Sequence, residues 1–323
     1  MSDTIETDEI KCCGSGCNNC VLDDRKTAQT TDASKSTRGN ILTVDGRKYM
    51  AFRLQRKWQC TDNVWRFKYV YVNAEDMLCN SLELVVPPGC HLMIRAAIDD
   101  MRSGTDRHDQ TTIGNFVSRP YTPINVDGNN GSFEILAKFE PNGLMSEYLR
   151  TSSVGDVVDV KGPYGDFKWT PNAARHLICV SQGVGIAPLF AVVSSILSNE
   201  EDETWIDFLA CFRSIEDILL RDELHAFREY WNFQSTIYLA DESACSCDTD
   251  ARISNCVCIT AKRKYNEILC TFRLDETELA KLFIGKRIEN CFVLVCGTGR
   301  FINSIKMSLE KLHIKDENLI VFD

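Results

Sequence analysis

The sequence predicts a two-domain protein of the β plus α/β class, in which an antiparallel β-barrel precedes an α/β domain with a parallel sheet. Between residues 46 and 170, short segments rich in β-branched and aromatic residues follow one another with only one helical stretch. From residue 171 onwards, strand and helix patterns alternate. The change of pattern falls at the glycine-rich turn 162–167.

Length, charge and hydropathy set limits on the class of protein. A chain of 323 residues can bury two cores and carry a tail. The net charge of −10 argues against nucleic-acid partners. The acidic N-terminus resembles neither a secretory signal nor a myristoylation site, and Gly183, Gly185 and Pro188 interrupt the most apolar window. We expect a cytoplasmic protein without a transmembrane segment, either free or peripheral to an organelle membrane, and its oligomeric state stays open.

The N-terminal segment 1–45 is polar except for a cysteine-rich knot. Cys17-x-x-Cys20 has the spacing of a metal-binding turn, and Cys12 and Cys13 bring the thiols to four. The alternative is a reduced tail that docks without metal. A zinc site more often pairs two separated turns, so we predict no metal and keep Cys12, Cys13, Cys17 and Cys20 as weak candidate ligands.

In the first domain we expect strands at 49–54, 64–72, 92–98, 132–139 and 157–160. The one helical stretch follows Gly143-Leu144-Met145-Ser146 and runs towards Arg150. The free N–H groups of such a helix start can bind an anion, whereas the simpler interpretation is a serine N-cap.

In the second domain we expect strands at 177–180, 206–211, 236–239, 292–296 and 319–322, and helices at 188–197, 219–230, 276–283 and 301–312. The stretch 241–274 is expected to be a variable surface loop, although its Cys-x-Cys pairs leave metal binding open.

The segment Arg119-Pro120-Tyr121-Thr122-Pro123 combines a cation, an aromatic ring and a hydroxyl. Strand alternation places Arg119 and Tyr121 on one face and Thr122 on the other. The two prolines favour a strand end or a sheet edge. The set suits a ligand that is anionic at one end and planar at the other, and the alternative is an ordinary surface strand end.

Two further turns have the residue types of a nucleotide site. Gln182-Gly183-Val184-Gly185-Ile186-Ala187-Pro188 follows the first strand of the parallel sheet, where glycines let the backbone approach a pyrophosphate. Pro188 is expected at the first position of the following helix. Cys296-Gly297 ends a later strand, and a lone cysteine there would otherwise be assigned to the core.

Arg119-Pro-Tyr-Thr, Lys138, Gly143-x-Met-Ser, Gly183-x-Gly-x-x-Pro and Cys296-Gly, in this order, resemble the motifs of the ferredoxin-reductase-type flavoproteins. Among these, the chain looks like the NADH–cytochrome b5 reductases, and its N-terminal cysteines look like the oxidoreductase-like segment of the NADH–cytochrome b5 reductase-like members. Asp217-Ile-Leu-Leu-Arg221 is similar to a further family segment. The resemblance covers residues 46–323 and implies an FAD-binding barrel at 46–170 and an NAD-binding domain at 171–323.

The resemblance also implies the role of each residue. Arg119 would pair with the FAD pyrophosphate, Tyr121 would pack on the isoalloxazine, and Thr122 would hydrogen-bond near its N5. Cys296 would border the nicotinamide of NADH, which makes Thr122 and Cys296 the catalytic candidates. The implied cofactor-binding residues are Arg119, Pro120, Tyr121, Thr122, Lys138, Gly143, Leu144, Met145, Ser146, Gly183, Val184, Gly185, Pro188, Asp217, Cys296 and Gly297.

The sequence departs from the family at two positions and gives mixed evidence on the nucleotide. Val184 replaces a threonine, and the chain ends Phe322-Asp323 instead of in an aromatic residue. Asp217 favours the free 2′-hydroxyl of NADH, whereas Arg213 would suit the 2′-phosphate of NADPH. The acidic Asp241-Glu242 pair tips the prediction towards NADH.

The resemblance implies an enzyme that oxidises NADH and passes single electrons to a haem protein, with cytochrome b5 as the first candidate. Because the chain is acidic, a quinone, a ferric chelate or an iron–sulphur protein is the alternative acceptor. A third possibility is a redox- or metal-responsive interaction protein that keeps the flavin fold, which the sixteen cysteines suggest.

Overall fold

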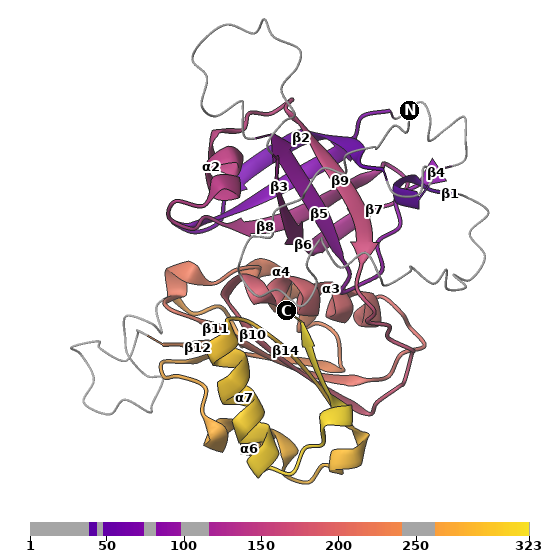
Figure 1. The fold of residues 1–323 in the computed structure, drawn as a ribbon. Coiled ribbons are helices and arrows are strands. Elements are labelled where there is room, and N and C mark those ends of the chain that lie inside the picture. The colour runs from indigo at the N-terminus through magenta and orange to yellow at the C-terminus, as the bar shows by residue number, and fades with distance from the viewer. Residues whose placement is uncertain (1–38, 44–47, 74–81, 98–115, 241–261, 323) are drawn as a thin grey trace, which may run out of the picture. The chain divides into compact units, whose positions relative to one another are not determined.

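The structure is a computed structural model that describes residues 39–43, 48–73, 82–97, 116–240 and 262–322 (Figure 1). The barrel and the α/β domain fall within one compact unit, Arg38–Phe322. The N-terminal candidate ligands Cys12, Cys13, Cys17 and Cys20 lie outside the described residues, as do the Cys-x-Cys pairs of the insertion, Asp241, Glu242 and Asp323.

The first domain is a seven-stranded antiparallel sheet with the strand order β6-β5-β9-β2-β3-β8-β7. Its strands are β2 (Met50–Gln59), β3 (Val64–Tyr71), β5 (His91–Ala97), β6 (Phe116–Tyr121), β7 (Pro123–Asp127), β8 (Ser132–Lys138) and β9 (Val157–Tyr164). The two edge strands, β6 and β7, are consecutive in the chain with only Thr122 between them. The sheet therefore curls until its edges meet at Thr122, which confirms the predicted barrel (Figure 1).

Smaller elements complete the domain: β1 (Gly39–Asn40), the 3₁₀ turn η1 (Ile41–Thr43), β4 (Leu82–Glu83) and the helix α2 (Leu144–Thr151). Aromatic side chains fill the barrel, and Phe52, Phe67, Tyr69 and Phe133 are almost fully buried. On β8, the side chains of Phe133, Ile135 and Ala137 face the barrel core. The outer face of β8 is also buried, because Leu136 packs in the same cluster as helix α3 (Ile186–Leu197) of the α/β domain.

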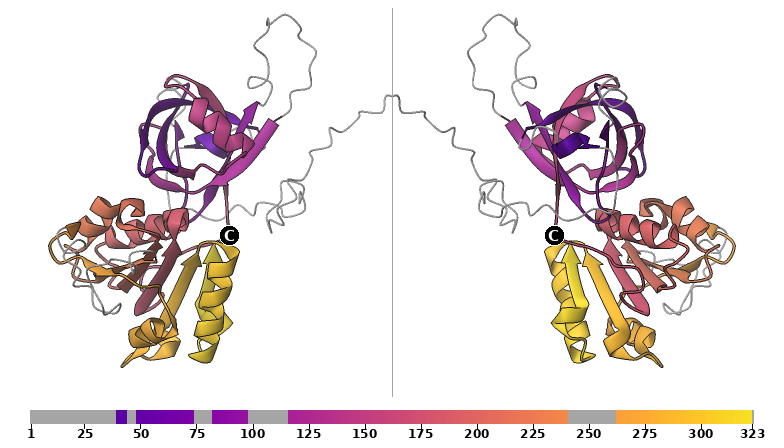
Figure 2. Two further views of the ribbon diagram at one scale, coloured as in Figure 1. Left: turned by 90° about the vertical axis from the view of Figure 1, so that its left-hand side faces the viewer. Right: turned by 90° about the vertical axis from the view of Figure 1, so that its right-hand side faces the viewer.

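The second domain has a six-stranded parallel sheet with the order β13-β12-β11-β10-β14-β15. The strands are β10 (His176–Gln182), β11 (Trp205–Phe212), β12 (Phe233–Leu239), β13 (Ile268–Cys270), β14 (Cys291–Cys296) and β15 (Leu319–Phe322). Helices cover both faces of the sheet (Figure 2). The helices α3 and α4 (Arg221–Phe227) pack on one face, and α6 (Glu276–Phe283) and α7 (Gly299–Lys311) on the other.

The 3₁₀ turns of this domain are η3 (Gly183–Gly185), η4 (Ile215–Asp217), η6 (Ile288–Asn290) and η7 (Asp316–Asn318). From β10 the chain builds outwards through β11, β12 and β13, and then returns to place β14 on the other side of β10. Open α/β sheets bind ligands at such a reversal, beyond the carboxyl ends of the strands. The ends of β10 and β14 are therefore the expected ligand site of this sheet.

Three details of the prediction for the second domain are wrong. Helix α3 begins at Ile186, so Pro188 is its third residue; it is tolerated there because the first N–H groups of a helix have no intrahelical acceptor. Helix α4 covers only Arg221–Phe227, because Leu220 adopts a left-handed φ of 53° and breaks the expected longer helix. The presumed loop contains β13, which pairs with β12.

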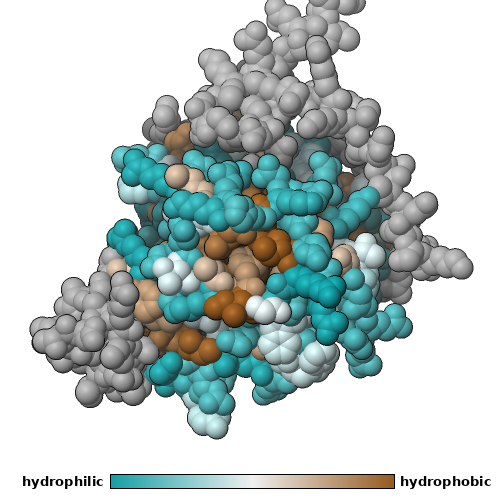
Figure 3. All heavy atoms as spheres, turned by 90° about the horizontal axis from the view of Figure 1, so that it is seen from below, coloured by the Kyte–Doolittle hydropathy of each residue, from teal (hydrophilic) through white to brown (hydrophobic). Residues whose placement is uncertain are grey.

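The surface of the described chain is mostly polar. Figure 3 shows a band of hydrophobic residues across the face seen from below, with hydrophilic residues bordering it. Trp231, Ile284 and Met307 are among the large hydrophobic side chains that are exposed. Within the described ranges, no helix has the length and apolar character needed to cross a bilayer.

Candidate active site

The segment between β6 and β7 presents an arginine and a tyrosine where the barrel edges meet. Arg119 is exposed, and one Nη donates a hydrogen bond to the Ser118 carbonyl at 2.8 Å. Among the described residues Arg119 forms no ion pair. Tyr121 is half-buried against the barrel core. Burial raises the pKa of the Tyr121 hydroxyl and the Arg119 guanidinium lowers it, which agrees with the expectation that the two side chains share a face.

Helix α2 is in contact with β6, and no side chain caps its N-terminus. Its N-cap is Gly143, which offers no side-chain acceptor. The Ser146 hydroxyl instead accepts a hydrogen bond from the Glu140 N–H at 2.9 Å, so the serine-cap interpretation is wrong. The first N–H groups of α2 thus lack a capping side chain and favour an anion. Leu144 is exposed and Met145 is buried.

Lys138 lies at the end of β8, where its ammonium group pairs with the Glu140 carboxylate at 2.6 Å. Both side chains are exposed. The structure therefore places Lys138 in a salt bridge at the rim of the barrel, where an approaching anion has to compete with Glu140.

The glycine turn after β10 is open on one side and tightly packed on the other. Gly183 has a φ of 54°, and a Cβ at this position would meet nothing within 4 Å. By contrast, a Cβ at Gly185 would lie 2.7 Å from the Cys296 carbonyl oxygen and 2.9 Å from the Gly297 nitrogen. Gly185 therefore lets the β10 and β14 ends lie together, and Gly183 leaves room for a ligand to approach the backbone. Val184 is half-buried against the core under α3.

A side-chain contact that the sequence analysis did not anticipate joins these two ends. The Gln182 Oε1 accepts hydrogen bonds from the Thr298 hydroxyl at 2.7 Å and from the Thr298 N–H at 3.3 Å. Next to it, Ser181 is fully buried and its hydroxyl has no hydrogen-bond partner. In sequence the Gln182–Thr298 contact spans 116 residues, so no spacing rule signals it.

Cys296 is half-buried and forms a register pair with Ser181 on one side and with Phe322 on the other. The Phe322 ring packs edge-on against Phe167 with 5.1 Å between ring centroids. A Cβ on Gly89 would lie 2.9 Å from that ring, which places the barrel turn at Gly89 against it. The penultimate residue of the chain thus borders Cys296 and touches the barrel.

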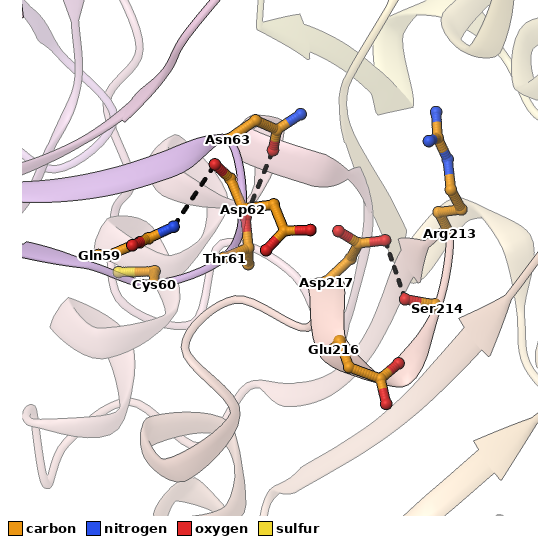
Figure 4. A pocket seen from close by; sticks show the side chains of 9 residues that line it. All are labelled: Gln59, Cys60, Thr61, Asp62, Asn63, Arg213, Ser214, Glu216 and Asp217. Carbon is orange, nitrogen blue, oxygen red and sulfur yellow. Dashed lines mark hydrogen bonds between the residues drawn. The ribbon is translucent and has the colours of Figure 1, made fainter. Parts of the chain in front are cut away.

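A cavity of about 660 Å³ lies at the end of β11 (Figure 4). Asp217, in η4, accepts a hydrogen bond from the Ser214 hydroxyl at 3.0 Å. Arg213, Ser214, Glu216 and Asp217 form one wall of the cavity, and residues 59–63 of the turn between β2 and β3 form the other. Asp217 and Arg213 were predicted from the sequence to lie beside the adenosine ribose of the nucleotide. The barrel turn was not predicted to take part.

The residues present fit both groups that the motifs imply. The exposed Arg119 on β6 and the uncapped N-terminus of α2, a helix in contact with β6, suit a diphosphate, and the half-buried Tyr121 ring suits a planar group, as FAD requires. The space above Gly183 suits the diphosphate of NADH. Strand β8 contacts η3, which brings the two halves of the site together. Within the described residues, no group of three or more His, Cys, Asp or Glu side chains could hold a metal ion.

Two known families of oxidoreductase domains match this chain. The oxidoreductase FAD-binding domain family matches residues 52–169, and the oxidoreductase NAD-binding domain family matches residues 179–307. The NADH-cytochrome b5 reductase-like protein of Homo sapiens is 28% identical over 97% of this chain and 92% of its own length. The chain is cytochrome b5 reductase-like, with the FAD-binding and NAD-binding domains of an oxidoreductase.

Further cytochrome b5 reductases are similar to this chain over shorter stretches. NADH-cytochrome b5 reductase 1 of Dictyostelium discoideum is 33% identical over 58% of each chain. Among solved structures, the cytochrome b5 reductase domain of Ulva prolifera nitrate reductase has a TM-score of 0.63 at 22% identity, covering 85% of this chain and 97% of that domain. Flavohemoglobin from Malassezia yamatoensis has a TM-score of 0.64 at 18% identity, and the match covers 86% of this chain and 61% of the flavohemoglobin chain. The likeness confirms the predicted ferredoxin-reductase-like fold.

Proposed function

We propose that this protein is an FAD-dependent oxidoreductase that oxidises NADH and passes single electrons to a haem protein, with cytochrome b5 as the first candidate. The observation that carries the proposal is the meeting of two sites. The Arg119–Pro123 segment lies at the barrel closure, and the Gly183–Gly185 turn, packed on Cys296-Gly297, touches barrel strand β8. The FAD-binding and NAD-binding oxidoreductase domains, and the similarity to NADH-cytochrome b5 reductase-like proteins, support the same activity.

Bound FAD supplies the conversion of a two-electron donor into two one-electron transfers. The chain's own residues bind and align. Arg119 and the α2 N-terminus neutralise the FAD diphosphate, and the Tyr121 ring packs on the flavin. The Thr122 hydroxyl, which lies at the turn between β6 and β7, would hydrogen-bond the flavin when FAD is bound.

On the nucleotide side, the Gly183 backbone would receive the diphosphate of NADH, and Cys296 and Gly297 would border its nicotinamide. The Phe322 ring, which packs on Phe167 and pairs in register with Cys296, would help to exclude water from the nicotinamide. The Asp217 carboxylate accepts a hydrogen bond from the adenosine ribose and disfavours a 2′-phosphate, so NADH is the preferred donor.

The acceptor is the finer part of the proposal, and local charge bears on it. In the full sequence, residues 48–168 include fourteen Lys and Arg and fifteen Asp and Glu, so the barrel domain is close to neutral although the whole chain has a net charge of −10. A nearly neutral barrel domain repels an acidic partner less than the overall charge suggests. An acidic haem protein therefore stays the first candidate, and quinone, ferric or iron–sulphur acceptors are the alternatives.

An anaerobic titration with NADH tests the activity. The purified protein is expected to be yellow, and NADH is expected to bleach its absorbance near 450 nm within seconds. A colourless protein, or a yellow one that NADH leaves unchanged, contradicts the proposal. Turnover with cytochrome b5, ferricyanide and quinones across ionic strength then identifies the acceptor, since steering of an acidic protein weakens with added salt.

We further propose that residues 1–45 form a separate oxidoreductase-like segment, 46–170 the FAD-binding domain and 171–323 the NAD-binding domain. A chain that begins at residue 46 is expected to keep full reduction by NADH. If it loses that activity while full-length protein carries zinc by mass spectrometry, the metal-responsive alternative is favoured instead.

A further inference from the structure

The turn between β2 and β3 belongs to the barrel, yet it lines the same cavity as the residues after β11. Gln59, Cys60, Thr61, Asp62 and Asn63 face Arg213, Ser214, Glu216 and Asp217 across a space of about 660 Å³. That volume is within the range of cavities that bind cofactors and other small molecules. Two domains therefore contribute to the wall of one pocket.

The turn is held in place by its own hydrogen bonds and by an ion pair. The Thr61 hydroxyl accepts from the Val64 N–H at 3.2 Å and donates to Asn63 Oδ1 at 3.3 Å. Farther along β3, Arg66 pairs with Glu223 of α4 at 2.6 Å, and α4 begins a few residues after η4. The pair thus links the strand that follows the turn to the element that follows Asp217.

The side chains that line the pocket give it an excess of negative charge that would act on a bound ligand. Figure 4 shows Asp62 pointing towards Asp217, whereas the Arg213 side chain points away from both. Among the described residues, neither Asp62 nor Asp217 is in an ion pair. Glu216, by contrast, is neutralised by Lys262 at 2.6 Å. The carboxylates of Asp62 and Asp217, neither of which has an ion-pair partner among the described residues, therefore both face the pocket.

We propose that the β2–β3 turn is the second wall of the adenosine pocket and that Asp62 is a specificity-determining residue that excludes a 2′-phosphate. The inference deepens the proposed function and rests on it, because it assumes that adenosine binds beside Asp217. A free ribose 2′-hydroxyl can donate to a carboxylate, whereas a phosphate dianion is repelled by two of them. The pocket therefore accepts the adenosine moiety of NADH. A carboxylate from each domain excludes the adenosine moiety of NADPH, which carries a 2′-phosphate.

Substitution of Asp62 tests the specificity. The ratio of kcat/KM for NADH to that for NADPH is measured for D62N, D217N and the double variant, with D127N, at the end of β7 and outside the pocket lining, as a control. We expect D62N to lower the ratio about tenfold and the double variant to lower it further, with D127N unchanged. An unchanged ratio in D62N overturns the inference even if D217N lowers it.

Alkylation of Cys60 tests the location independently of turnover. This thiol is exposed and lines the pocket, although burial, opposed by Arg66, raises its pKa. Labelling is followed by peptide mass spectrometry, with half-buried Cys270 as the internal control. ADP-ribose is expected to slow labelling of Cys60 at least fivefold, whereas nicotinamide mononucleotide, which lacks adenosine, leaves it unchanged. If ADP-ribose does not protect Cys60 while NADH still bleaches the flavin, the pocket assignment fails and the proposed function stands.

Discussion

Gly185 offers the sharpest test of how the nucleotide turn is built. In G185A, the added methyl carbon would lie 2.7 to 2.9 Å from the Cys296 carbonyl oxygen and carbon and the Gly297 nitrogen. Carbon atoms attract best at roughly 3.5–4.0 Å, so one of the two strand ends must move by about 0.7 Å. All three atoms are backbone, and the Gln182–Thr298 hydrogen bonds tie the same ends together, so no flexible side chain can absorb the shift.

Two consequences of G185A follow in magnitude. Overpacking of this kind costs about 1–3 kcal/mol, which for a domain of this size lowers the melting temperature by roughly 2–10 °C. A displacement approaching 1 Å at the site can lower a reaction rate by up to about 100-fold, so we expect flavin reduction by NADH to slow by about 10- to 100-fold. Stopped-flow absorbance near 450 nm measures the rate, and scanning calorimetry measures the melting temperature.

Two other glycines serve as controls for G185A. Gly299 has no atom within 4 Å of an added Cβ and opens helix α7, so G299A is expected to preserve both rate and stability. Gly183 also has room but a φ of 54°, so G183A should cost about 1 kcal/mol through backbone strain alone. If G185A reduces its flavin at the wild-type rate and melts as G299A does, the close approach of the two strand ends is wrong.

Three further predictions concern other contacts. Arg66→Met should destabilise the protein by about 3 kcal/mol in urea unfolding, because the carboxylate of Glu134 (10% exposed side chain) then keeps only Lys68, at 4.0 Å. Glu223→Gln, whose side chain is 35% exposed, should cost at most about 1 kcal/mol, and equal losses would contradict this. Arg119→Ala should purify with less than half the FAD of Arg56→Ala, a control on β2, by absorbance after gel filtration. For Asp202, burial raises the pKa, but hydrogen bonds from Thr204, Trp169 and Asn172 outweigh it and the net pKa is lowered. The ionised Asp202 carboxylate therefore stabilises the fold fully at a pH above its pKa in the unfolded state, about 3.9, and this stabilisation is lost as the pH falls through its lower pKa in the folded state. The unfolding free energy of D202N should therefore vary less with pH below about 4 than that of the wild type.

The features that could be predicted from the sequence are those that depend on local residue patterns. Strand periodicity located β3, β8 and β15 closely, and the ordered motifs led to the barrel segment at Arg119 and the turn at Gly183. Helix ends were less predictable, because the apolar run Ile218-Leu219-Leu220 reads as helix although Leu220 adopts a left-handed conformation. Contacts between distant segments were missed entirely. Neither the Gln182–Thr298 pair nor the position of Asp62 opposite Asp217 has a signature in spacing, since both arise only when sheets assemble.

The closure of the barrel at Thr122 has a consequence for how the protein behaves in concentrated solution. An exposed edge strand can recruit a strand from another molecule and so start aggregation, and this sheet has two edges. Pro120 lies in one edge strand and Pro123 begins the other, and neither residue has an N–H to offer an incoming chain. The segment Arg119–Pro123, which contains the residues proposed to hold the flavin, therefore also protects both edges of the sheet against intermolecular pairing through its two prolines.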